Sequence, residues 1–194
     1  MEMEIENNEK EITSFPSFTI FDKIINCHSD TITSISITNE NSDKNILATG
    51  SNDKFIKLFE INSPINNNSN NIITNSPEGS NNLKEIWKYQ YHIYGINKIK
   101  FSLDNKYLLS GGNDLQVNIV DINSQSLLRN FRLDSIVTSL DINYANNILV
   151  VGTYNNLMYL FDIRSRNCIC KMICHSEPIT DVKISYDSTV IYST

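Results

Sequence analysis

The apolar residues of this chain alternate with polar ones in short runs and do not recur at helical spacing. In the stretch 134–163 three such runs follow one another, over 137–142, 148–150 and 157–161. Segments rich in Asn, Gly and Thr separate them. Short alternating runs bounded by turn residues are typical of β-strands. The stretch therefore predicts an antiparallel meander of short strands.

The same pattern recurs along the chain. An apolar residue followed by apolar residues three and five positions later opens four segments, which begin at Ile32, Ile96, Val137 and Ile179. These starting points are 64, 41 and 42 positions apart. A tight turn recurs in step with them, as GSND at 50–53, GGND at 111–114 and GTYN at 152–155. A period of about 40–45 residues built from four strands predicts the blades of a β-propeller.

The first unit is about 20 residues longer than the others, and the additional residues lie in one segment. Residues 62–82 are rich in Asn and Ser and show no sustained alternation, so we predict a disordered loop there. It contains two Ser-Pro pairs, which make Ser63 and Ser76 candidate phosphorylation sites, although such pairs are also common in loops of this composition. The acidic segment 1–14 predicts a disordered tail, and 15–194 a partial propeller.

The number of units bears on the completeness of the propeller. The pattern gives three units and the start of a fourth, which begins at His175. Propellers close by radial repetition of typically four to eight blades, and closure protects their strand edges. We therefore expect an all-β, incomplete propeller of antiparallel four-stranded sheets that belongs to a longer protein.

Composition narrows the class of protein. The chain of 194 residues is 40% hydrophobic, enough for a sizeable core, and its net charge is -6. This charge argues against a nucleic-acid-binding surface spread over the whole chain. No apolar run reaches the length of a membrane span, and the acidic start is unlike a signal peptide. We expect a cytoplasmic or nuclear protein without direct nucleic-acid or membrane partners.

Candidate chemistry is sparse. Cys168, Cys170 and Cys174 precede His175 and suggest a zinc site, but four ligands on one extended strand cannot easily surround a metal tetrahedrally. We favour structural cysteines. The Gly50 and Gly111-Gly112 positions precede strands rather than helices, which argues against a phosphate-binding loop. The sequence predicts no catalytic residues, no metal and no cofactor.

Dipeptides at the unit boundaries carry a family resemblance. A histidine in three units, or Asp134 in the third, stands where each unit begins, and the units end at Phe59-Glu60, Val120-Asp121 and Phe161-Asp162. From about His28 onward the chain resembles the WD-repeat family, whose units begin near Gly-His and end near Trp-Asp. Neither the tryptophan nor the glycine before the histidine is kept, so the resemblance depends on period, strand pattern and the His and Asp positions.

The resemblance implies a structural hydrogen-bond network in each blade. Its imidazole would bond the aspartate of the tight turn and a hydroxyl on the second strand. The expected members are His28, Thr49 and Asp53 in the first unit, His92, Ser110 and Asp114 in the second, and His175 in the fourth. The third unit has Asp134, Val151 and Asn155 in these places, and we expect it to be the weakest blade.

The resemblance also implies a function. Propellers of this family present loop ends and rims to other proteins, so we expect a non-catalytic scaffold within a multi-subunit complex. One alternative comes from segment 167–193, which looks like a stretch of the WD-repeat subunit of histone-methyltransferase complexes; that similarity implies binding of arginine-containing peptides. A propeller-type enzyme is the least favoured alternative, because no acid-base set stands apart from the repeat positions.

Overall fold

The computed structural model describes residues 26–39, 44–61, 83–165 and 167–194. Within these ranges all regular structure is β-strand, and no helix is present that could cross a membrane. The fourteen strands are β1 (Ile32–Ile37), β2 (Ile46–Ser51), β3 (Ile56–Ile61), β4 (Leu83–Tyr89), β5 (Ile96–Phe101), β6 (Tyr107–Gly112), β7 (Gln116–Asp121), β8 (Ser126–Arg132), β9 (Val137–Ile142), β10 (Ile148–Thr153), β11 (Leu157–Asp162), β12 (Asn167–Ile173), β13 (Val182–Ile184) and β14 (Ile191–Ser193). The predicted tail and loop, with Ser63 and Ser76, lie outside the described residues.

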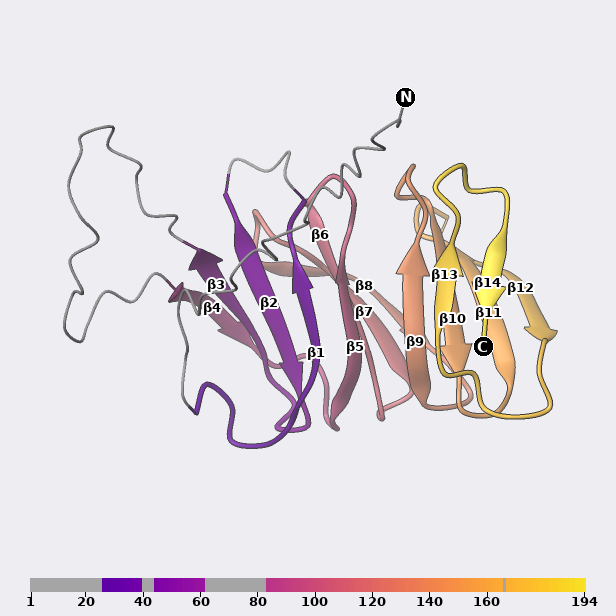
Figure 1. Ribbon diagram of the computed structural model, residues 1–194, viewed down its shortest axis with the longest axis horizontal. Coiled ribbons are helices and arrows are strands. Elements are labelled where there is room, and N and C mark those ends of the chain that lie inside the picture. The colour runs from indigo at the N-terminus through magenta and orange to yellow at the C-terminus, as the bar shows by residue number, and fades with distance from the viewer. Residues whose placement is uncertain (1–25, 40–43, 62–82, 166) are drawn as a thin grey trace, which may run out of the picture.

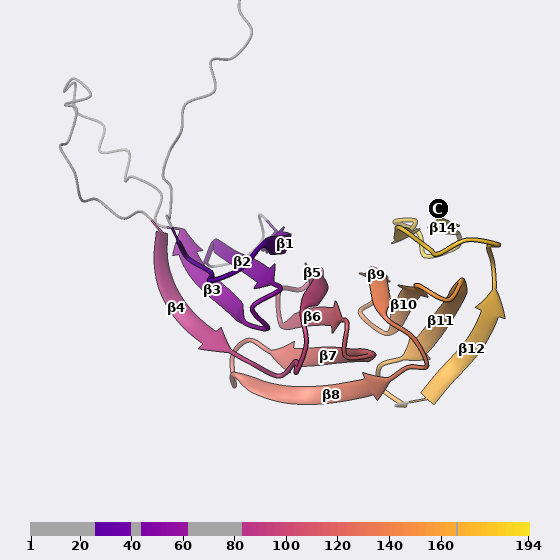
Figure 2. The same cartoon turned by 90° about the horizontal axis from the view of Figure 1, so that it is seen from below.

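The strands form successive antiparallel sheets in chain order. Three sheets have four strands each, β1 to β4, β5 to β8 and β9 to β12, and β13 pairs with β14 in a two-stranded sheet. The sheets stand side by side in an open arc, with β1, β5 and β9 on its inner side and β4, β8 and β12 on its outer rim (Figures 1 and 2). This arrangement confirms the predicted all-β, incomplete propeller, and each four-stranded sheet is one blade.

The second strand of each blade is longer than the sequence indicated. We expected these strands to end before Gly50, Gly111 and Gly152, but β2, β6 and β10 include all three glycines. Each glycine faces the first strand of the next blade. A Cβ on Gly111 would lie 2.3 Å from Val137 Cγ1. Glycine is needed here for close approach between blades rather than for a turn.

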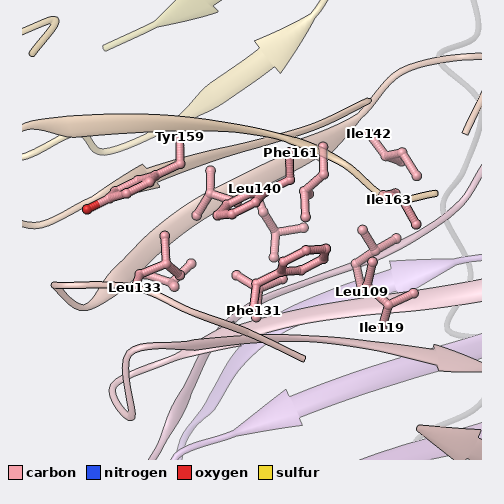
Figure 3. Packing of buried hydrophobic residues seen from close by; sticks show 13 residues of the cluster. Leu109, Ile119, Phe131, Leu133, Leu140, Ile142, Tyr159, Phe161 and Ile163 are labelled. Carbon is pink, nitrogen blue, oxygen red and sulfur yellow. The ribbon is translucent and has the colours of Figure 1, made fainter. Parts of the chain in front are cut away.

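Apolar side chains from adjacent blades form the core. Between the second and third blades, Leu109, Ile119 and Phe131 face Leu140 and Phe161 (Figure 3). The Phe131 and Phe161 rings are 4.6 Å apart between centroids. A similar cluster lies between the first and second blades, and a smaller one between the third blade and β13. Each blade is therefore stabilised mainly by its neighbours, as in other repeat proteins.

Strand β1 shows what this packing requires. Its apolar residues Ile32, Ile35 and Ile37 are exposed, and Ile35 is 61% exposed. The equivalent residues of β5, for example Ile99, are buried against the preceding blade. The apolar spacing that opens each unit therefore marks the face that contacts the preceding blade.

Candidate functional site

The second blade contains a buried imidazole-carboxylate pair at the end where β5 begins. His92 precedes β5, and Asp114 lies in the turn between β6 and β7, so antiparallel pairing brings both to the same end of the sheet. His92 Nδ1 is 2.9 Å from Asp114 Oδ1 and 3.0 Å from Oδ2. The Ile93 backbone N–H donates to Asp114 Oδ2 at 3.1 Å. The carboxylate thus joins the turn before β5 to the turn after β6.

A second set of contacts orients the other side of the ring. His92 Nε2 lies 2.9 Å from Ser110 Oγ and 3.2 Å from Asn118 Nδ2. Asn118 Oδ1 accepts from Asn130 Nδ2, which makes Asn118 Nδ2 the donor toward the ring. An Nε2 that accepts a hydrogen bond requires the neutral ring to carry its proton on Nδ1, facing Asp114. The side-chain contacts therefore predict that His92 carries its proton on Nδ1.

The first blade repeats this arrangement. His28 Nδ1 is 2.9 Å from Asp53 Oδ2, and His28 Nε2 is 2.8 Å from Thr49 Oγ1. Backbone N–H groups of Ser29 and Phe55 donate to the Asp53 carboxylate, each at 3.0 Å. Asp53 therefore holds both turns, as Asp114 does in the second blade.

The pKa values of the two aspartates respond to these contacts. Burial raises the pKa of Asp114, but the hydrogen bond from His92 and the backbone N–H of Ile93 outweigh it, and the pKa lies below its ordinary value. Burial also raises the pKa of Asp53, but hydrogen bonds from the Phe55 backbone N–H and from His28 lower it by more, so this pKa too lies below its ordinary value. Both carboxylates are therefore ionised and act as acceptors at neutral pH.

The third blade lacks the buried pair. Asp134 occupies the histidine position, and its exposed carboxylate bonds Lys171 Nζ and accepts from the Tyr159 hydroxyl at 3.3 Å. The hydrogen bond from Lys171 is the main cause of the lowered pKa of Asp134. In the turn, the Thr153 hydroxyl is 2.7 Å from Asn155 Oδ1. That this blade is the weakest stays a prediction. It has an exposed ion pair where the first two blades have a buried imidazole-carboxylate pair.

The fourth unit shows the start of the same set. His175 Nε2 is 2.7 Å from Ser193 Oγ on β14, the strand that corresponds to β2 and β6. The structure thus brings together the histidine and second-strand hydroxyl in three units, and the aspartate as well in the first two.

Large apolar side chains are exposed at this same end of the blades. Ile93 and Tyr94, in the turn before β5, are 60% and 57% exposed, and Tyr154, in the turn after β10, is 61% exposed. We call Ile93, Tyr94 and Tyr154 the turn-face residues. Because Ile93 donates its backbone N–H to Asp114, the buried pair also fixes the backbone next to Tyr94.

The cysteines occupy the outer strand of the third blade and its continuation. Cys168 and Cys170 are in β12, and Cys174 follows it; all three, like Cys27, are free thiols. Burial raises the pKa of the Cys174 thiol. Within the described ranges, no group of three or more His, Cys, Asp and Glu residues could hold a metal ion.

Comparison with known proteins agrees with this geometry. The family model "WD domain, G-beta repeat" matches residues 21–60 and 83–121, which include the two blades with a complete imidazole-carboxylate pair. These two stretches are WD repeats by that match.

Two curated relatives come from Dictyostelium discoideum. The WD repeat domain-containing protein 83 homolog is 27% identical over 147 residues, which cover 75% of this chain and 38% of that protein. The mitotic checkpoint protein bub3 is 30% identical over 74 residues, or 38% of this chain and 22% of that protein. The chain therefore spans well under half the length of these curated relatives.

Sequence reasoning placed the main network residues but missed two features of the site. Asn118 reaches His92 from the third strand of the same blade, and only the strand register shows that contact. The exposure of the turn-face residues was missed as well, because Ile and Tyr are residue types that are common in protein cores. Their position directly after a network histidine, outside any alternating run, was the available signal.

Proposed function

We propose that this chain is a non-catalytic scaffold that binds a partner protein through its turn-face residues, as a subunit of a larger complex. The observation that supports this most directly is the exposure of Ile93, Tyr94 and Tyr154 at one end of the blades, with the turn of Ile93 and Tyr94 held by the backbone bond to Asp114. Exposed aromatic side chains on a rigid support provide large contact area at low entropic cost. The match of residues 21–60 and 83–121 to WD repeats also supports a protein partner.

The burial of His92 supports a structural rather than a catalytic role for this histidine. His92 is 1% exposed, and its two ring nitrogens are both engaged within the blade. A general base must come within hydrogen-bond reach of a substrate proton. His92 has neither the access nor a free nitrogen for that task. A cytoplasmic or nuclear location is part of the same proposal, and fractionation of cells that express the tagged chain tests it.

Affinity capture with quantitative mass spectrometry tests the scaffold. The bait is the tagged chain, and the variant is Ile93→Ser/Tyr94→Ser/Tyr154→Ser. Tyr186→Ser is the matched control, because Tyr186 is 79% exposed in the turn between β13 and β14, at the end opposite the turn face. We expect proteins captured by the chain and by the control to be lost from the triple variant. Equal capture by all three folded proteins would contradict a role for the turn face.

A further inference from the structure

A cavity of about 350 Å³ opens between the second and third blades at the end opposite the turn face. Its walls come from the turn between β5 and β6, from β8, and from the turns that follow β9 and β11. Arg129 of β8 and Arg164 after β11 bring two guanidinium groups to it. Leu128, Tyr107 and Ile163 supply apolar surface. This size is near the lower end of ligand sites, suited to one or two side chains of a peptide.

The charge of Arg129 is not compensated within the blade. Its Nη1 donates to the Leu128 carbonyl at 2.8 Å, and its Nε is buried without a hydrogen-bond partner among the described residues. Within those residues no carboxylate forms an ion pair with Arg129. A guanidinium carries five N–H donors and stays charged at all physiological pH values. Nη1 thus makes the one hydrogen bond of this guanidinium within the described residues.

One carboxylate also lines the cavity, but it has partners of its own. Asp104 Oδ1 accepts from the Ser102 hydroxyl at 2.6 Å and from the Lys106 backbone N–H at 3.2 Å. Lys106 Nζ lies 3.7 Å from the other oxygen of Asp104. Within the described residues, the Arg164 guanidinium forms no ion pair and has a longer-range interaction with Asp162, whose pKa is lowered mainly by the Arg164 backbone N–H. The cavity thus keeps an excess of positive charge, although the chain as a whole is acidic.

We propose that this cavity is an oxyanion site, which we call the interblade pocket, and that it binds the phosphate or carboxylate of an acidic segment in a partner protein. Arg129 and Arg164 provide charge-assisted hydrogen bonds to the oxyanion, for which the planar guanidinium is well matched. Leu128 and Ile163 contact the aliphatic atoms beside it. Because the interblade pocket and the turn face lie at opposite ends of the blades, this inference goes beyond the docking surface proposed above.

Fluorescence anisotropy with labelled peptides tests the interblade pocket. The probes are three peptides of sequence Gly-Leu-X-Leu-Gly in which X is phosphoserine, glutamate or serine. We expect the purified chain to bind the phosphoserine or the glutamate peptide and not the serine peptide. Arg129→Met and Arg164→Met are each expected to weaken binding at least about tenfold, the effect of losing one charge-assisted hydrogen bond. Arg132→Met, on the same strand but outside the cavity, should bind normally.

Several results would overturn the proposal. Equal affinity of all three peptides, or equal affinity of the Arg129, Arg164 and Arg132 variants, would do so. Arginine-dependent binding to vesicles of phosphatidylcholine with a phosphoinositide, but to none of the peptides, would replace the protein partner with a lipid. If Arg129→Met does not fold, Arg129→Lys keeps the stem and charge and should weaken binding through loss of the planar fork. The turn-face triple variant should keep peptide binding, which separates this test from that of the scaffold.

Discussion

Replacement of His92 by alanine should destabilise the protein by removing the acceptor and donor contacts that hold two turns. The variant loses the bond to Asp114 at 2.9 Å and the contact with Ser110 at 2.9 Å, and it leaves a buried carboxylate with fewer donors. A hydrogen bond to a charged group contributes about 1.5–3 kcal/mol, so we expect a loss of about 2–3 kcal/mol. For a chain of this length that corresponds to a fall in Tm of about 4–12 °C.

The third blade offers a matched control for this variant. Asp134 occupies the same repeat position as His92, but its side chain is 68% exposed. Exposed ion pairs contribute little to stability, so Asp134→Ala should leave the Tm unchanged within error. The assay is thermal and urea unfolding followed by circular dichroism. If His92→Ala unfolds at the same temperature as Asp134→Ala, the buried pair does not stabilise the blade and the reasoning is refuted.

Three further predictions concern other parts of the blades. The pKa of Asp114 is lowered in the folded protein, so its contribution to the free energy of unfolding is present above the unfolded pKa and is lost as pH falls through the folded pKa. In Asp114→Asn, the free energy of unfolding measured with urea should therefore depend less on pH below about 4. Gly111→Ala should cost about 1–3 kcal/mol, since its Cβ would lie 2.3 Å from Val137 Cγ1; an unchanged urea midpoint would contradict this. Lys54 has a φ of 75°, and Lys54→Asn should raise the urea midpoint, because asparagine tolerates that conformation, as Asn156 does in the third blade; a lower midpoint would contradict this.

The strand order was predictable because the same apolar spacing recurs about every 41 residues, which indicates successive four-stranded units. The spacing that begins at Ile96 or Val137 marks the face of the first strand that contacts the preceding blade, and the structure has strands over Ile96–Phe101 and Val137–Ile142, as predicted. The ends of the second strands were predicted less well. A glycine before a polar turn reads as part of that turn, whereas Gly111 lies in β6 because the next blade approaches it.

The site was predictable only where the repeat fixes it. His92 and Asp114 lie close together because two turns fall at the same end of a meander, and the WD-repeat resemblance implied the bond between them. Contacts between blades depend on how the sheets rotate about the arc, and a single sequence does not specify that rotation. The interblade pocket is of this kind, since Arg129 and Arg164 come from different blades and are 35 positions apart in the chain.

The central claim is that a buried imidazole-carboxylate pair closes the turn end of a blade. The most direct test is a two-dimensional ¹⁵N NMR spectrum of the three imidazoles in the labelled protein at neutral pH, with His92→Ala to assign one of them. The structure predicts that His92 carries its proton on Nδ1, held by Asp114, with Nε2 accepting from Asn118. A His92 signal typical of a proton on Nε2 alone, or of rapid exchange between the two tautomers, would contradict the claim.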